Sequence, residues 1–255
     1  MPREDSSPEN PTAVLLVGGL GTRLRPILPS TPKPLAPIGD IPFLQLLILQ
    51  LRSQDIRRLV MCTGHLADQI EEEFGDGRKW EVKIYYSRES SPLGTAGALK
   101  FAGHYLSLNS DFLVLNGDSF LELDIRRFLC FHRQQDGWAT IGVRRVPDAA
   151  RYGTVKLDAL NRVVRFIEKT GLQEPGLING GVYVFNRAIL EQIPNGVCSL
   201  EKDVLPGIVE HGVYALEQKG MFIDIGTPED YARAQELRVR LSQAAQSGTL
   251  ATRTL

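Results

Sequence analysis

The sequence is poor in cysteine, and the few thiols it has are widely spaced. Its 255 residues include only Cys62, Cys130 and Cys198, none of them in a Cys-x-x-Cys pair. Three isolated thiols argue against a disulfide framework and against a zinc site. We therefore expect them to be small buried side chains in a reducing compartment, and we expect the protein to be cytoplasmic.

Excess charge and long apolar runs are also missing. The 29 basic residues nearly balance the 30 acidic ones, which argues against a protein that holds nucleic acid or anionic lipid by bulk charge. The longest apolar passage, residues 43–51, is interrupted by Gln45 and Gln50 and is far shorter than the roughly 20 residues needed to cross a bilayer. The first eleven residues have prolines, serines and charges but no apolar segment, unlike a secretory signal. We expect no nucleic-acid partner and no membrane partner.

What the chain does contain is a regular alternation of short apolar runs and amphipathic segments. Such an order, with short connections, predicts an α/β fold in which helices cover both faces of a mostly parallel mixed sheet, a Rossmann-like three-layer sandwich. We expect one domain over residues 12–242, with flexible tails at 1–11 and 243–255. Strands are expected at residues 12–17, 57–63, 82–86, 112–116, 139–145, 153–157, 162–167 and 177–185, and helices at 43–52, 66–74, 95–102, 124–135 and after the Thr227-Pro228 cap.

A glycine-rich loop follows the first expected strand. Without a Cβ in the way, the backbone N–H groups of Gly18, Gly19 and Gly21 can approach phosphate oxygens closely. Arg23 and Arg25 add guanidinium groups able to grip phosphate. The loop matches neither the P-loop signature nor the dinucleotide fingerprint Gly-x-Gly-x-x-Gly. The competing interpretation is a flexible turn carrying two solvated arginines.

A lysine between two prolines strengthens the phosphate-binding interpretation. Pro32 and Pro34 flank Lys33, and because proline fixes the backbone, little entropy is lost in holding that amine in one place. By itself, Lys33 could equally be a solvated loop residue.

The segment GGLGTRLRP followed by PKPLAPI resembles the sugar-1-phosphate nucleotidylyltransferases, and the similarity runs over residues 13–237. The resemblance implies the nucleotide-diphospho-sugar transferase fold and an enzyme that joins a nucleoside triphosphate to a sugar 1-phosphate, releasing pyrophosphate. It also implies that Arg23 and Lys33 act in catalysis by steadying the triphosphate. The loop residues implied to cradle the nucleotide are Gly18, Gly19, Gly21 and Thr22.

Two aspartates are candidates for holding Mg²⁺, the expected cofactor. Asp118 follows the apolar run FLVLN, and Asp224 precedes the last helix. Mg²⁺ in phosphoryl-transfer sites is bound by one or two carboxylates together with phosphates and water. Spacing alone leaves a turn aspartate and a helix-leading acid as alternatives. The resemblance favours metal ligands, because the segments NGD and D-x-G-T-P match the magnesium-binding segments of the family, and it makes Asp118 catalytic.

Four further residues are implied to bind the sugar phosphate. Glu168 and Lys169 end the expected strand RVVRFIEK, where spacing alone would indicate a solvated strand end, and the family's Glu-Lys pair there binds the sugar and its phosphate. Gly153 and Asn179 match other sugar-contacting segments, and the Asn179 amide offers both a donor and an acceptor. The segment SLEKD also recurs in the family, but we interpret it as a structural helix start.

Glu89 bears on the choice of base, because it precedes a second glycine turn, at Gly94 and Thr95, that in the family contacts the base. A carboxylate only accepts hydrogen bonds, and guanine presents two adjacent donors, so Glu89 favours GTP over UTP or dTTP, although it could also face solvent. Within the family, segments such as IYYSRESSPLGTAGALK and FIDIGTPEDY most resemble the D-glycero-α-D-manno-heptose 1-phosphate guanylyltransferases.

Several alternatives stay open at the level of sequence. Mannose-1-phosphate guanylyltransferases share many of these segments, and uridylyl or thymidylyl transfer to a hexose or amino-sugar 1-phosphate is a rival within the enzyme class. A catalytically idle regulatory subunit that binds a nucleotide sugar, and a dinucleotide-dependent oxidoreductase, are the interpretations from other classes. The sequence also leaves a homo-oligomer open.

Overall fold

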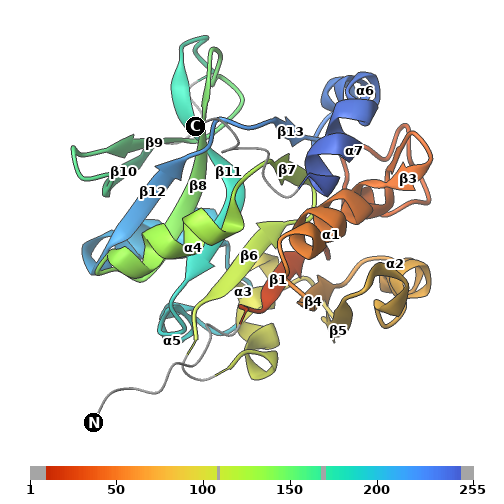
Figure 1. Cartoon of the computed structure of the whole chain (residues 1–255), viewed down its shortest axis with the longest axis horizontal. Coiled ribbons are helices and arrows are strands. Elements are labelled where there is room, and N and C mark those ends of the chain that lie inside the picture. The colour runs from red at the N-terminus through yellow and green to blue at the C-terminus, as the bar shows by residue number, and fades with distance from the viewer. Residues whose placement is uncertain (1–9, 108–109, 168–170, 248–255) are drawn as a thin grey trace.

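A mixed sheet crosses the computed structural model, which describes residues 10–107, 110–167 and 171–247, and helices cover both of its faces (Figure 1). Four parallel strands form one half. The other half is mixed: β11 runs antiparallel to β6 and to β8, and β12 is parallel to β8. The strands across the sheet are β5 (Lys83–Arg88), β4 (Arg58–Thr63), β1 (Ala13–Leu16), β6 (Phe112–Asn116), β11 (Gly176–Phe185), β8 (Ala139–Val146) and β12 (Val213–Glu217), with β9 (Thr154–Leu157) and β10 (Val163–Ile167) beside β11.

The central strand shows why the sheet needs cover on both sides. Successive side chains of a strand point to opposite faces, and in β1 both faces are apolar and buried. Ala13 and Leu15 belong to one core cluster, and Val14 belongs to the other. The prediction of a mostly parallel mixed sheet with helices on both faces is confirmed.

Each core cluster is closed by its own helices. Phe43 and Leu47 of α1 and Phe128 of α4 pack in the cluster on one face. Leu99 of α3 and Ile189 of α5 pack in the cluster on the other face. The helices are α1 (Phe43–Ser53), α2 (Ala67–Phe74), α3 (Gly94–Phe101), α4 (Ile125–Gln134), α5 (Ile189–Gln192), α6 (Pro228–Glu236) and α7 (Arg238–Gln246).

Two small two-stranded sheets accompany the main one. In the first, β7 (Ser119–Leu121) pairs with β13 (Phe222–Asp224), and in the second, β2 (Pro37–Ile38) pairs with β3 (Ile41–Pro42). Thr227 caps α6 by accepting a hydrogen bond from the Asp230 N–H, with Pro228 in the first turn, so the expected start of this helix is confirmed. No helix in the described ranges has the length and apolarity that a bilayer crossing requires.

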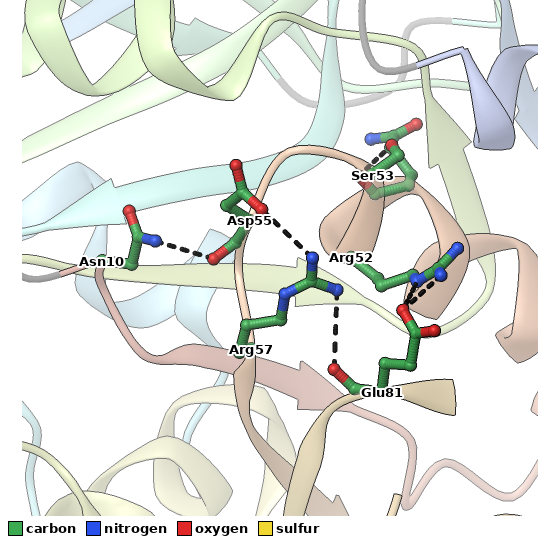
Figure 2. A network of polar contacts seen from close by, with 7 residues as sticks. Asn10, Arg52, Ser53, Asp55, Arg57 and Glu81 are labelled. Atoms are coloured by element: carbon green, nitrogen blue, oxygen red, sulfur yellow. Dashed lines mark hydrogen bonds and ion pairs between the residues drawn. The ribbon is translucent and has the colours of Figure 1, made fainter. Parts of the chain in front are cut away.

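Both expected tail boundaries need correction. Helix α7 continues to Gln246, and its Leu241 and Ala245 are fully buried in the core cluster that contains α1, so residues 243–246 belong to the domain. At the other end, Pro11 is buried, and the Asn10 side chain donates to the Asp55 carbonyl at 2.8 Å (Figure 2). The polar composition of both segments hid these contacts.

Candidate active site

A cavity of about 430 Å³ opens where the chain changes direction across the sheet. From β1 the order runs to β4 and β5 on one side, whereas β6 lies on the other side of β1. Ligands of open α/β sheets bind in the crevice at such a switch point, beyond the carboxyl ends of the strands. Here the loops that follow β1, β5 and β6 provide the walls.

All residues expected to bind the nucleotide line this cavity. Gly21 has φ +58°, a left-handed conformation that glycine adopts without strain. Arg23 is exposed, and no partner for its guanidinium is found among the described residues, so it is available to an anion. The residues that the structure brings together here are Gly18, Gly19, Gly21, Thr22, Arg23, Glu89, Gly94 and Thr95.

Lys33 and Asp118 face each other in the same cavity. The Lys33 Nζ donates to Asp118 Oδ2 at 2.6 Å. Pro32 and Pro34 on either side are buried, so the backbone that carries the lysine is anchored. The lysine side chain is 10% exposed and the aspartate 40%, which leaves the carboxylate open to a ligand.

Asp224 joins this pair through the small sheet, in which it lies opposite Ser119. Its Oδ1 accepts from the Gly226 N–H at 2.5 Å. Burial raises the pKa of Asp224, the negative charge of Asp118 raises it further, and the Lys33 ammonium opposes both effects. Two carboxylates therefore share one ammonium, at a place where further positive charge would stabilise both.

This donor set fits a magnesium ion. The described residues contain no cluster of three or more side chains of the kinds that bind metals, so the usual zinc and calcium cages are not found there. Mg²⁺ needs only one or two carboxylates, because phosphate oxygens and water complete its octahedron. Asp118 and Asp224 are the residues that would hold it.

A second cavity, of about 740 Å³, adjoins the first and shares Arg23, Asn116 and Gly226 with it. Besides Arg23, three of the expected site residues, Gly153, Asn179 and Asp224, line this second cavity. Glu168 and Lys169 lie outside the described residues. The strand that precedes them, β10, ends at Ile167, which lines the same cavity.

An ion pair on the wall of the second cavity went unnoticed in the sequence. The guanidinium of Arg151 donates to both carboxylate oxygens of Asp230, at 2.7 and 3.0 Å. Thr227 also donates to Asp230. Because Arg151 lies between β8 and β9, its pair with Asp230 connects that segment to the start of α6. In the sequence, Asp230 reads only as an early acid of a capped helix, and nothing marks Arg151 as its partner.

Glu201 is the other residue that sequence reasoning missed. The interpretation of its segment as a helix start is confirmed in part, because Ser199 caps the π-helical turn Leu200–Val204 by accepting from the Lys202 N–H at 3.2 Å. Glu201 itself, however, lines the second cavity and accepts from Thr95, which lines the first. The capping pattern concealed a side chain between two cavities.

Glu89 lies in the wall of the first cavity with one oxygen already bound. Its Oε2 accepts from the Leu93 N–H at 3.2 Å, and Oε1 lies so close to Gly18 and Gly64 that a Cβ added to either glycine would be 3.3 or 2.7 Å from it. Burial raises the pKa of Glu89. A half-buried carboxylate with unused lone pairs is suited to accept hydrogen bonds from a ligand.

A glycine loop at the switch point of the sheet, with a lysine and two carboxylates beside it, is an arrangement suited to a phosphorylated nucleotide in an α/β protein. Residues 12–239 match the model of the family described as nucleotidyl transferase. The chain belongs to this family.

Relatives with named activities share more than a third of its residues. It is 38% identical over 226 residues to the D-glycero-alpha-D-manno-heptose 1-phosphate guanylyltransferase of Aneurinibacillus thermoaerophilus, covering 88% of this chain and 96% of that protein. It is 38% identical over 232 residues to the mannose-1-phosphate guanylyltransferase of Mycobacterium tuberculosis, covering 89% of this chain and 64% of that protein. The chain spans about two thirds of the length of the mannose-specific relatives.

A solved structure agrees over nearly the whole domain. The crystal structure of HddC from Yersinia pseudotuberculosis, complexed with GMP-PN, superposes with a TM-score of 0.79 at 37% identity. The match covers 88% of this chain and 98% of HddC. The fold implied by the sequence resemblance is thereby confirmed.

Proposed function

We propose that the protein transfers a guanylyl group from GTP to a sugar 1-phosphate, with D-glycero-α-D-manno-heptose 1-phosphate as the favoured acceptor, and releases pyrophosphate. One observation carries the proposal. Two cavities share a wall at Arg23, Asn116 and Gly226, and Lys33 with its two carboxylates lies beside that wall. A nucleotide in the first cavity and a sugar phosphate in the second would meet there.

The reaction needs no protein nucleophile. An oxygen of the sugar phosphate forms a bond to the α-phosphorus, the bond from that phosphorus to the bridging oxygen breaks, and pyrophosphate leaves with the electron pair. Arg23 and Lys33 offset the charge that develops on the phosphoryl oxygens, and the glycine loop holds the triphosphate in line. Positioning and electrostatic stabilisation of this kind supply most of the acceleration in phosphoryl transfer.

Magnesium is the proposed cofactor. Bound by Asp118 and Asp224, it would add positive charge beside the phosphates. Lys33 already bonds Asp118 at 2.6 Å, so the lysine holds that carboxylate in a fixed orientation. The Gly226 N–H likewise orients the Asp224 carboxylate.

The base preference rests on Glu89. Its free acceptor positions face the cavity that contains the glycine loop. Guanine offers N1–H and N2–H₂ side by side, and a carboxylate can accept both, whereas uracil and thymine pair a donor with an acceptor. UTP and dTTP would each leave one carboxylate oxygen facing a carbonyl oxygen.

Mannose 1-phosphate is the second candidate acceptor, favoured by the 38% identity to the mannose-specific relative. The two sugars share the manno ring and differ by one CHOH unit. The second cavity, of about 740 Å³, is large enough for either. Cys62 and Cys198 are buried, as expected, whereas Cys130 is exposed, and the cytoplasmic setting is part of this proposal.

A matrix of substrates tests the proposal. Each of the four nucleoside triphosphates is combined with heptose, mannose, glucose and N-acetylated sugar 1-phosphates in the presence of magnesium, and pyrophosphate release is followed. We expect GTP with the heptose phosphate to be fastest and a chelator to stop the reaction. Nucleotide binding without pyrophosphate release in any combination would indicate the idle regulatory subunit. A faster reaction with UTP or dTTP would overturn the role given to Glu89.

A further inference from the structure

Glu201 occupies a place that the proposed reaction leaves without a role. Its carboxylate lies between the two cavities, and within the described part of the chain no lysine or arginine pairs with it. A half-buried carboxylate without a cation is costly unless hydrogen bonds satisfy it. The side chains that hydrogen-bond to Glu201 therefore indicate its role.

Four side chains donate to this carboxylate. Oε2 accepts from the hydroxyls of Thr95 at 3.1 Å and Ser199 at 3.3 Å. Oε1 accepts from the Tyr183 hydroxyl at 3.1 Å and from Asn116 Nδ2 at 3.5 Å. An ionised carboxylate has about four lone-pair sites. All of them are used by the protein, so Glu201 has none left for a sugar hydroxyl.

One pair of these partners belongs to the nucleotide side. Thr95 is in the first turn of α3 and lines the first cavity, and its hydroxyl also accepts from the Leu200 N–H at 2.7 Å. The same segment is fixed to the helix by its backbone, since the Ala96 N–H donates to the Cys198 carbonyl at 3.0 Å. Gly94, with φ +73°, permits this approach, because a Cβ there would lie 2.5 Å from the Cys198 oxygen.

Of the other two donors, Asn116 lines both cavities and Tyr183 leads to the sugar side. The Tyr183 hydroxyl donates to Glu201 and accepts from Asn179 Nδ2 at 2.8 Å. Asn179 lines the second cavity, and its Oδ1 accepts from the Gly181 N–H at 2.9 Å. Tyr183 is fully buried, and burial followed by the charge of Glu201 raises its pKa, so the phenol keeps the proton it donates. The hydrogen bonds from Asn179 to Tyr183 and from Tyr183 to Glu201 therefore each have a fixed direction.

We infer that Glu201 is a positioning residue that sets the nucleotide cavity and the sugar cavity at a fixed distance and orientation, through Thr95 on one side and through Tyr183 and Asn179 on the other. The inference rests on the proposed function, because it assigns one substrate to each cavity. In-line transfer requires the two reacting phosphates within near-attack distance, and a misplacement of about 1 Å can cost a hundredfold in rate. Because donors from both cavities occupy all the acceptor positions of Glu201, its carboxylate fixes the distance between the two reacting phosphates.

The test uses one central variant and two that remove a single arm. Glu201→Gln removes the negative charge that all four hydrogen bonds share, and it puts an amide NH₂ where two donors already point. One arm is therefore broken and the other is weakened. We expect kcat per folded molecule to fall about a hundredfold, because the reacting phosphates lose their alignment. We also expect the KM values for GTP and for the sugar 1-phosphate each to rise about tenfold, as for a lost charge-assisted hydrogen bond. Thr95→Val should raise only the KM for GTP, and Tyr183→Phe only the KM for the sugar 1-phosphate.

Glu191→Gln is the matched control, because Glu191 is exposed on α5 and lies outside both cavities. It should behave as the wild type. A purely structural role of Glu201 would lower only the folded fraction, so that kcat per folded molecule and both KM values would be unchanged. That result, or a rise of KM in Glu201→Gln for only one of the two substrates, would overturn the inference.

Two remaining outcomes are also decisive. If Glu201→Gln fails to fold, as judged by circular dichroism and thermal melting, the single-arm variants decide, and an effect of either on the wrong substrate refutes the inference. If the wild-type protein shows no turnover, the proposed function fails. Calorimetry with GTP and magnesium then tests Glu201 separately. Glu201→Gln and Thr95→Val should each weaken GTP binding about tenfold, and Tyr183→Phe should leave it unchanged. An unchanged GTP affinity of Glu201→Gln would refute the inference.

Discussion

The contact between Lys33 and Asp118 allows activity to be separated from stability by a single substitution, Asp118→Asn. The side chain keeps its size and loses its charge. Because Asp118 is 40% exposed, the pair with Lys33 is screened by solvent and contributes at most about 1 kcal/mol to stability. Removal of the charge also relieves Asp224, whose pKa is raised by burial and then by Asp118. We expect the melting temperature to change by less than about 4 °C.

The effect on turnover should be far larger. Asp118→Asn removes one of two carboxylates proposed to hold magnesium and also releases the Lys33 ammonium, which is held at 2.6 Å. Loss of one preorganised electrostatic group costs about 10²–10³ in kcat. We therefore expect at least a hundredfold loss of pyrophosphate release at saturating GTP, sugar 1-phosphate and magnesium.

Asp124→Ala provides the opposite pattern as a control. Asp124 caps α4, accepts from the Arg127 N–H at 2.9 Å and is absent from the walls of both cavities. Its loss should cost about 1 kcal/mol of stability and leave turnover unchanged. If Asp118→Asn retains turnover within about tenfold of the wild type, a difference of only about 1.4 kcal/mol in the barrier, Asp118 has no electrostatic role in the reaction.

Three further perturbations probe other parts of the molecule. Glu89→Gln should reduce the preference for GTP over UTP. Because the folded pKa of Glu89 is raised by burial, its ionised form destabilises the fold above the ordinary pKa of 4.5, so the variant should melt slightly higher at neutral pH and equally near pH 3. Arg151→Lys loses the paired bonds to Asp230 and should raise the KM for the sugar 1-phosphate but not for GTP. Leu241→Ala, in the buried face of α7, should cost about 2–5 kcal/mol in denaturant unfolding, and an unchanged midpoint would contradict the placement of α7 in the core.

The parallel half of the fold follows from local sequence patterns. Residues 12–17, 57–63 and 112–116 are short apolar runs bounded by turn residues, and each contains a strand of the sheet. Helix α4, which follows the last of these strands, likewise has an apolar face at helical spacing, and Asp124 supplies its cap. A strand buried on both faces leaves a continuous apolar run, which is readable without the structure.

The mixed half and the C-terminal end were less readable. Strand β12 is only five residues long and β13 three, and nothing in so short a run shows that β12 lies parallel to β8 or that β13 pairs with β7. Helix α7 is weakly amphipathic, and its last turn reads as a polar tail. It is helical because Leu241 and Ala245 pack against the core beside α1, a tertiary contact that no local pattern records.

The candidate site likewise has a part that the sequence predicts and a part that only the structure shows. The glycine loop and Lys33 stand close together in the sequence, and the structure places both in one cavity, where their grouping was expected. Asp224 and Glu201 come from distant segments, and each reaches the site only through a pairing the sequence does not show. Asp224 depends on β13 beside β7, and Glu201 depends on the attachment of the Ser199 segment to α3.

These pairings explain why the two cavities can act as one site. The nucleotide cavity is built almost entirely from the parallel half, whereas the sugar cavity is built from β9, β10, β11 and the segments around Glu201 and Asp230. Two independent connections join them: the small sheet that places Asp224 near Asp118, and the hydrogen bonds that converge on Glu201. In the proposed arrangement the carboxylates adjoin both cavities and the saturated glutamate lies between them, so we expect a change on either substrate's side to alter the geometry at the phosphates.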